Sequence, residues 1–152
     1  MDYLKIQMEL MKESNKRDTK NKIVHIGYGF YKDRVVLIND FYAALVPKDR
    51  CYLNLETAFR NATAFDAGKF FDYTTVPAKD TNAMVLYKKH KLRAFSFGKE
   101  KIYVNEDFLK VFKLDNPRYE AVNTRSPLFL FEGDQCAGLI LPFNLKEEEL
   151  WT

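Results

Sequence analysis

The amino-acid sequence predicts an α+β fold in which a helix followed by three antiparallel strands occurs twice. Two observations lead to this prediction. Residues 2–47 begin with a helical apolar period that changes to a period of two. Residues 101–145 contain a strand pattern, a short helix pattern and three further strand patterns separated by clear turns. We expect these segments to form two halves of one clamp-like domain, residues 1–152, related by an approximate twofold axis.

The first half opens with an amphipathic helix over residues 2–14. Its apolar residues recur at helical spacing, as a core-facing helix requires. We expect this stripe to be buried: Leu4, Ile6, Met8, Leu10 and Met11. The polar residues 15–22 that follow should form a connection to the first strand.

Three strands then follow in the first half. Alternation of apolar residues through Val24, Ile26, Tyr28 and Phe30 predicts a strand with one buried face. A turn at residues 32–34 leads to a second strand over 35–38, and a turn at residues 39–40 leads to a third over 41–46. These three patterns complete the first half.

The middle of the chain, residues 48–83, has the least regular pattern. Asn54 is a suitable cap for a short helix through Phe59. Four aromatic residues within 65–73 form either a binding surface or a lid over one end of the core: Phe65, Phe70, Phe71 and Tyr73. The lid is favoured, because exposure of so many rings promotes association.

A basic hairpin follows, with strands over residues 84–87 and 92–97. Six basic residues occupy its tip and flanks: Lys88, Lys89, Lys91, Arg93, Lys99 and Lys101. Aromatic residues lie between them, and lysines with rings are what single-stranded nucleic acid sites use for phosphates and for stacking. The alternative is a solvated hairpin whose charges protect a strand edge. A net charge of only +3 favours that alternative.

The second half contains the clearest helix signal. Asn105 is a good N-cap, and the acidic Glu106 and Asp107 suit the positive end of the helix dipole. The dipeptide Asn116-Pro117 ends the helix, and three strands follow over 119–122, 128–131 and 138–141. The expected core residues are Phe108, Phe112, Leu128, Leu139 and Leu141.

The last third of the chain carries a family resemblance. It contains a helix opened by Val104-Asn105 and a terminal run SPLFLFEGDQCAGLILPFNL, residues 126–145. Both features resemble the closing unit of a domain of the bacterial DNA sliding clamp, the polymerase processivity factor. In that family the last strand commonly reads as a hydrophobic run, proline, one residue, a basic or polar residue, and leucine. Residues 139–145 are similar, with Asn144 where a basic residue is usual.

The resemblance implies paired halves, each with a strand, a helix and three further strands, and a link to DNA. One departure is that no obvious strand precedes the first helix of this chain. Encirclement of DNA would require several copies of such a domain. Because the ring-forming edges are in doubt, we expect a monomer or dimer and no closed ring.

Several classes of function are not expected from this sequence. It has no apolar run long enough to span a bilayer and no basic N-terminal segment followed by an apolar core, which predicts a cytoplasmic protein without membrane contact. Cys51 and Cys136 lie far apart, outside any metal-binding spacing, and are expected to be reduced. His25 and His90 have no acid or nucleophile in a recognisable motif. We expect no catalytic residues, no cofactor and no metal.

These observations predict a non-enzymatic binding or accessory module, linked to DNA metabolism of a bacterium or mobile element. DNA binding, if present, is expected to be weak. The alternative is a protein-interaction adaptor or inhibitor that uses the aromatic segment 65–73 or the acidic, flexible tail 146–152. The expected partner-surface residues are Phe70, Phe71, Tyr73, Leu150 and Trp151.

Overall fold

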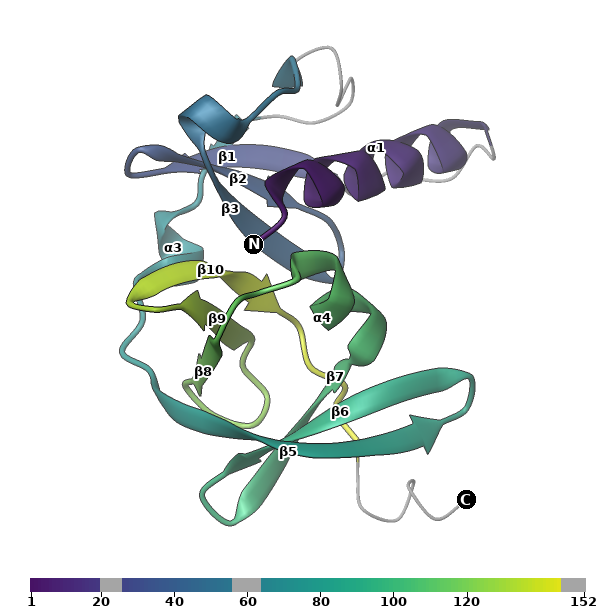
Figure 1. Cartoon of the computed structure of the whole chain (residues 1–152), viewed down its shortest axis with the longest axis vertical. Coiled ribbons are helices and arrows are strands. Elements are labelled where there is room, and N and C mark those ends of the chain that lie inside the picture. The colour runs from purple at the N-terminus through teal and green to yellow at the C-terminus, as the bar shows by residue number, and fades with distance from the viewer. Residues whose placement is uncertain (20–25, 56–63, 146–152) are drawn as a thin grey trace.

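A computed structural model of the chain describes residues 1–19, 26–55 and 64–145 (Figure 1). In chain order its elements are α1 (Tyr3–Thr19), β1 (Gly27–Tyr31), β2 (Arg34–Ile38), β3 (Tyr42–Pro47), the 3-10 helix η1 (Lys48–Arg50), β4 (Ala64–Asp66), α3 (Gly68–Phe71), β5 (Val76–Tyr87), β6 (His90–Phe97), β7 (Glu100–Asn105), α4 (Glu106–Phe112), β8 (Pro117–Ala121), β9 (Leu128–Glu132) and β10 (Gln135–Ile140). The fold is α+β, with a mostly antiparallel sheet. The helix predicted after Asn54 falls largely on residues 56–63, outside the described residues.

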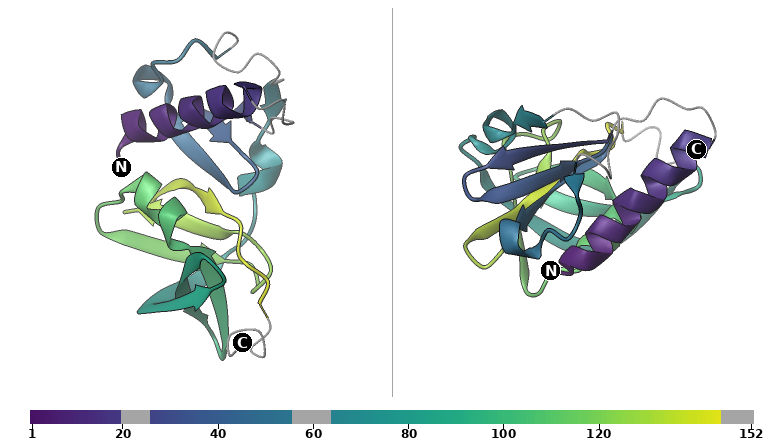
Figure 2. Two further views of the ribbon diagram at one scale, coloured as in Figure 1. Left: turned by 90° about the vertical axis from the view of Figure 1, so that its right-hand side faces the viewer. Right: turned by 90° about the horizontal axis from the view of Figure 1, so that it is seen from above.

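The described strands pair in the order β4-β1-β2-β3-β10-β9-β8-β5-β6-β7. All neighbours run antiparallel except β1 and β4, which are parallel. Each predicted group of three strands is present, as β1-β2-β3 and as β8-β9-β10. The groups meet at their last strands, β3 and β10, whose register places Ala44 opposite Gly138. The strands β5 to β7 form the end of the molecule away from α1 and β4 (Figures 1 and 2).

The main core lies between the sheet and the two longer helices, α1 and α4, which contact each other. Tyr42 of β3 packs edge-on against Phe112 of α4, with 5.6 Å between ring centroids. A smaller apolar cluster covers the other face of the sheet, where Phe70 and Phe71 of α3 pack near Phe129. The central strands are therefore buried on both faces, which explains why β3 reads as a continuous apolar run.

Gly138 allows β3, β10 and α4 to approach closely. A Cβ atom at this position would lie 2.2 Å from the carbonyl oxygen of Ala43 and 2.6 Å from Cε1 of Phe112. No side chain fits in that space, so only glycine permits this contact of sheet and helix. Pairing shifts register between Cys136 and Gly138, which marks a bulge at the same place.

The second half matches most of its sequence prediction. The side chain of Asn105 accepts a hydrogen bond of 2.9 Å from the backbone N–H of Asp107, as an N-cap does. The helix ends at Phe112, and Lys113 adopts a left-handed conformation with φ of 47°. Of the expected core residues, Phe112, Leu128 and Leu139 are buried, and Phe108 is half-buried.

Leu141 was wrongly predicted to be buried, and 47% of it is exposed. Its backbone N–H donates to the carbonyl oxygen of Phe41, so it still lies beside the β3 seam. Side chains alternate in direction along an extended chain. Because Ile140 points into the core, Leu141 points to the opposite side.

The buried face of α1 differs from the predicted one. Ile6 and Leu10 are fully buried, as expected, but Leu4 and Met8 are about half exposed. Gln7 is buried instead, because every polar group of its side-chain amide is hydrogen-bonded. Its Nε2 donates to the carbonyl oxygens of Tyr3 and Arg50, at 2.9 Å each. Its Oε1 accepts from the backbone N–H of Tyr52 at 2.8 Å. These bonds to the segment after β3 fix the rotation of the helix.

Two further predictions for the first half need correction. α1 continues to Thr19, because residues 15–19 contain no glycine or proline to end it. Phe30 is 43% exposed, whereas Ile26 and Tyr28 of the same stripe are buried. Val24 lies outside the described residues. Among the described helices, none combines the length and the hydropathy needed to cross a bilayer.

A matched pair of leucine substitutions on α1 tests its rotation. Leu10→Ala should lower the free energy of unfolding by about 2 to 5 kcal/mol, because it leaves a cavity in the core. Leu4→Ala, on the exposed side of the same helix, should change the free energy of unfolding by less than about 0.5 kcal/mol. Urea denaturation followed by circular dichroism measures both values. Equal losses, or a larger loss at Leu4, would contradict the orientation described here.

Candidate functional site

The six basic residues singled out in the sequence do not form one surface. Lys88 and Lys89 make the turn between β5 and β6, and Lys91 follows them. Lys99 lies in the turn between β6 and β7, at the opposite end of β6, and Lys101 follows on β7. The eight residues of β6 separate these turns by roughly 23 Å at 3.3 Å per residue. Figure 1 shows the two hairpin ends pointing in different directions.

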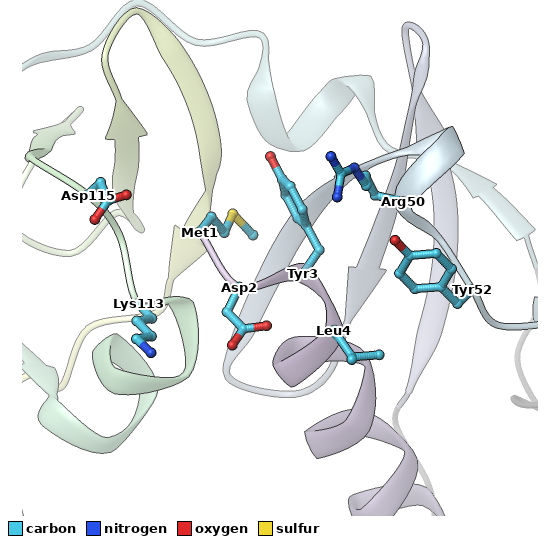
Figure 3. Close-up of a pocket in the computed structure, with 8 residues that line it drawn as sticks. All are labelled: Met1, Asp2, Tyr3, Leu4, Arg50, Tyr52, Lys113 and Asp115. Atoms are coloured by element: carbon cyan, nitrogen blue, oxygen red, sulfur yellow. The ribbon is translucent and has the colours of Figure 1, made fainter.

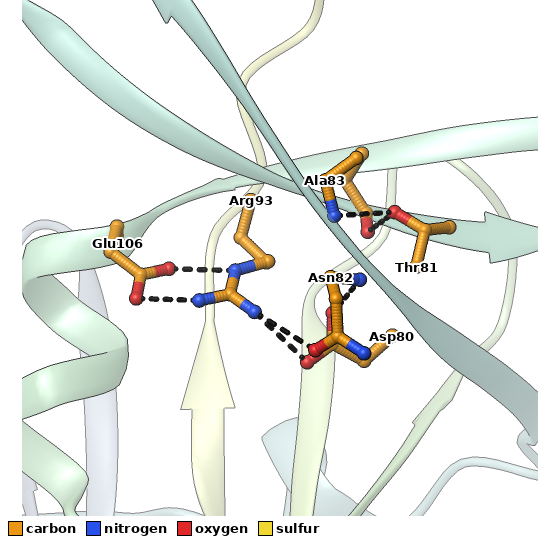
Figure 4. A network of polar contacts seen from close by, with 7 residues as sticks. Asp80, Thr81, Asn82, Ala83, Arg93 and Glu106 are labelled. Atoms are coloured by element: carbon orange, nitrogen blue, oxygen red, sulfur yellow. Dashed lines mark hydrogen bonds and ion pairs between the residues drawn. The ribbon is translucent and has the colours of Figure 1, made fainter.

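The sixth basic residue, Arg93, is engaged inside the fold (Figure 4). Its Nε and Nη2 donate to the two carboxylate oxygens of Glu106, at 2.9 and 2.8 Å. Its Nη1 lies 3.4 Å from Oδ2 of Asp80 and 3.3 Å from Oδ1 of Asn82. The hydrogen bonds to Glu106 raise the pKa of the guanidinium further above its ordinary value. The guanidinium of Arg93 is therefore engaged within the protein, unlike the five exposed lysines of the same group.

The Arg93 contacts hold a bulge in β5. Pairing of β5 with β6 shifts register between Asp80 and Met84, and Asn82 at the bulge has a positive φ of 58°. Asp80 Oδ1 accepts from the N–H of Asn82 at 2.8 Å, and Thr81 Oγ1 donates to the carbonyl of Ala94 at 2.7 Å. Before the bulge β5 pairs with β8, and after it, among the described strands, with β6 alone.

A groove at the β6–β7 end combines cations with aromatic rings. We call it the basic groove and define it by Lys99, Lys101, Tyr103, Arg125 and Phe143, which line a hollow of about 560 Å³. Its walls come from the β6–β7 turn, the loop between β8 and β9, and the segment after β10. The backbone N–H of Phe143 donates to the carbonyl oxygen of Tyr103 at 2.8 Å. This bond joins the backbones of the two aromatic residues, and the Phe143 ring packs against the His90 ring, with 5.4 Å between centroids.

The loop that carries Arg125 is held by its own side chains. Ser126 Oγ accepts from the backbone N–H groups of Val122 and Asn123, at 3.1 Å each. Asn123 Oδ1 accepts from the backbone N–H of Arg125 at 2.8 Å. Such local bonds replace regular secondary structure in a tight loop. They fix the backbone of Arg125 at the mouth of the basic groove.

The three cations of the basic groove are exposed, and within the described part of the chain none of them forms an ion pair. One carboxylate, that of Glu100, also lines the groove. The local charge is therefore positive, which suits an anion. Sequence reasoning found Lys99 and Lys101 but missed Arg125 and Phe143. These two residues lie more than twenty positions further along the chain, and no local motif connects them to the lysines.

The groove between α1 and α4 has balanced charge. It has a volume of about 500 Å³, and its floor includes Phe41 and Phe108, whose rings stack with centroids 5.1 Å apart. Equal numbers of cations and carboxylates line it: Lys5, Lys12 and Lys110 with Glu9, Glu13 and Asp107. This helical surface therefore offers no net attraction for phosphates from its described residues.

The aromatic segment lies mostly against the sheet. Phe71 contacts Tyr31, with 5.3 Å between ring centroids, and Phe129, with 6.5 Å. Phe70 packs in the same small apolar cluster, whereas Tyr73 is 56% exposed. Phe70 and Phe71 are half-buried, so the lid and the partner surface both stay predictions. Leu150 and Trp151 lie outside the described residues.

Another hollow lies at the start of α1, with a volume of about 640 Å³ (Figure 3). Residues 1–4 lie between Arg50 and Tyr52 on one side and Lys113 and Asp115 on the other. Two cations and two carboxylates line it, and the arrangement includes no nucleophile beside a base. The residues around this hollow do not form a recognisable catalytic or ligand-binding arrangement.

The described residues show neither a group of metal ligands nor an activated cysteine. Among the described residues, no three His, Cys, Asp or Glu side chains are grouped so that they could hold a metal ion. Cys51 and Cys136 are free and half-buried. Burial raises the pKa of the Cys136 thiol, which disfavours the reactive thiolate. The basic groove is therefore the candidate site with the clearest chemical character.

Comparison with known proteins identifies no similar protein. No protein-family model, curated protein or solved structure matches this chain. The resemblance to a sliding-clamp domain stays a prediction from the sequence.

Removal of the Arg93 side chain tests its role in the fold. Arg93→Ala leaves the largely buried Glu106 carboxylate without its bidentate partner. We expect a loss of about 2 to 3 kcal/mol in unfolding free energy, below the fully buried case because Arg93 is partly exposed. The matched control, Lys91→Ala on the same strand, should cost less than about 0.5 kcal/mol. A loss at Arg93 no larger than at Lys91 would refute this role.

Proposed function

We propose that the protein is a non-enzymatic accessory module of DNA metabolism, in the cytoplasm of a bacterium or encoded by a mobile element, and that it binds single-stranded DNA in the basic groove. One observation carries the proposal: Lys99, Lys101 and Arg125, unpaired among the described residues, line one hollow together with Tyr103 and Phe143. Cations neutralise phosphates, and aromatic rings stack with unpaired bases. Three cations can neutralise only a few phosphates, so the binding is weak.

The structure favours a single strand over a duplex. A duplex bound in the manner of a clamp would face the helices, and the groove between α1 and α4 carries equal numbers of positive and negative side chains. In the basic groove, three cations and two aromatic residues line one hollow. Stacking requires that base faces are accessible, which holds for a single strand.

A clamp-like architecture also belongs to this proposal. The strand order β1-β2-β3-β10-β9-β8 is symmetric about the β3–β10 pair, and each group of three strands is accompanied by one of the contacting helices α1 and α4. An approximate twofold axis through the β3–β10 seam would relate the two units. In an experimental structure, residues 2–47 and 101–145 should superpose by a rotation near 180°. Units that differ in the placement of α1 and α4 on their strands would contradict this arrangement.

In the protein-interaction alternative, Tyr73 is the exposed member of the aromatic segment, whereas Phe70 and Phe71 are half-buried against the sheet. Support for protein contact comes instead from the apolar end of β5, where Leu86 is 70% exposed. That surface lies at the opposite end of β6 from Lys99 of the basic groove.

Titration with a short fluorescent single-stranded oligonucleotide tests DNA binding. The triple variant Lys99→Ser, Lys101→Ser, Arg125→Ser should weaken binding and flatten the log–log salt dependence by about 0.7 for each lost phosphate contact. The matched control is Lys88→Ser, Lys89→Ser, Lys91→Ser, which removes the same charge from the other hairpin end. It should bind nearly as the unmodified protein does.

Two results would overturn the proposal. One is an affinity of the unmodified protein no tighter than about 10⁻⁴ M at physiological salt, the weak limit of ordinary non-specific binding. The other is an equal loss in both triple variants, which would indicate a general effect of net charge. A duplex oligonucleotide of the same length should bind less tightly than the single strand.

A further inference from the structure

The end of β5, residues 83–87, is unusually apolar for an exposed strand. We call this segment, Ala83-Met84-Val85-Leu86-Tyr87, the β5 edge. Leu86 is 70% exposed and Met84 is 48% exposed. Natural proteins usually protect an open edge with charged residues or proline. The β5 edge contains neither, and its nearest lysines lie in the turn that follows.

The backbone of the β5 edge has unpaired hydrogen-bonding groups on one side. Tyr87 pairs with His90 across a two-residue turn, and in such a hairpin these two residues exchange hydrogen bonds. The pattern alternates along the strand, so Val85 also bonds to β6. Met84 and Leu86 then direct their N–H and C=O groups away from β6. Among the described strands none pairs with that side, because β8 pairs with β5 only at residues 76–78.

The β5 edge is complementary to a second copy of itself. If two edges run antiparallel with Val85 on the twofold axis, Met84 of each copy lies opposite Leu86 of the other. These are the residues with outward backbone groups, so the two pairs exchange four hydrogen bonds. The four side chains of the same residues fall on one face of the joined sheet. They would cover each other's apolar surface.

Charge adds no attraction to this pairing. In the same register the turn residues Lys88 and Lys89 of one copy come opposite residues 81–82 of the other, next to Asp80. The carboxylate of Asp80 is already paired with Arg93, so the pairing depends on the backbone groups and the apolar side chains. The Arg93 contacts support the geometry, because they hold the bulge that turns the β5 edge away from β8.

We propose that the protein forms a twofold dimer through antiparallel pairing of the β5 edges of two copies. A twofold contact of this kind uses the same patch on both copies and closes, so it yields a dimer and no filament. The patch is small, so the dimer is weak and forms reversibly with rising protein concentration. Lys99 of the basic groove stays accessible, since the β6–β7 turn lies at the other end of β6.

Sedimentation across a concentration series tests the dimer. From about 1 μM to about 1 mM, the range expected for a small interface, the average mass should rise from 17.9 kDa toward twice that value. Leu86→Lys should shift the midpoint at least about tenfold upward, because it places an ammonium group in the apolar cluster. The matched control is Leu4→Lys on α1, at a leucine 53% exposed, and it should associate as the unmodified protein does.

Cysteine cross-linking tests the register without disturbing the apolar cluster. Residues opposite each other in a non-hydrogen-bonded antiparallel pair have Cα atoms about 4.5 Å apart, within the range that a disulfide spans. Val85→Cys should therefore form a covalent dimer rapidly under mild oxidation. Leu86→Cys, which lies opposite Met84, should cross-link more slowly, and the unmodified protein measures the background from Cys51 and Cys136.

Three results would overturn the proposed pairing of the β5 edges. The chain could keep the mass of one copy throughout the concentration series. Leu86→Lys could associate as strongly as the unmodified protein, which would assign self-association to another surface. Val85→Cys could cross-link no faster than Leu86→Cys, which would exclude the register. Thermal melting of Leu86→Lys should match the unmodified protein, and if this variant fails to fold, the cross-linking comparison still decides.

Discussion

The contact of Phe112 with Gly138 is the constraint on which the rest of the structure depends. The two groups of three strands are joined into one sheet where β3 pairs with β10, and the α4 helix packs over this seam. Any Cβ atom at residue 138 would overlap the backbone of Ala43 and the Phe112 ring. Glycine therefore lets the sheet continue between the groups while an aromatic ring of the helix lies directly on it. Interiors are close-packed, so a side chain here would force the helix or the strand to move.

A second set of contacts shapes the other end of the molecule. Arg93 bridges β6, the start of α4 and the bulge of β5, and its two hydrogen bonds to Glu106 have fixed bidentate geometry. The carboxylate lies in the first turn of α4, where the helix dipole also favours negative charge. This network separates the end of β5 from β8. Arg93, which the sequence grouped with the phosphate-binding candidates, thus connects β6, α4 and the β5 bulge within the fold.

The two proposals concern opposite ends of β6. The lysines of the basic groove lie at and beside the β6–β7 turn, and the β5 edge lies beside the β5–β6 turn. In the proposed dimer, the two β6 strands extend away from the axis and carry the lysines of one basic groove near each far end. Two weak sites on one molecule can bind a strand together with a higher apparent affinity, provided that the strand spans both. Self-association and weak nucleic-acid binding would then support each other.

The sequence by itself determined the elements whose signals are local. It identified the cap at Asn105, the turns of the hairpins and two groups of three strands, because caps, turns and alternation depend on neighbouring residues. It missed the rotation of α1, where Gln7 is buried because Arg50 and Tyr52 bond its amide. It grouped Arg93 with free lysines, and it missed Arg125 and Phe143 in the basic groove. Each of these depends on contacts between residues far apart in the chain, which only the tertiary structure decides.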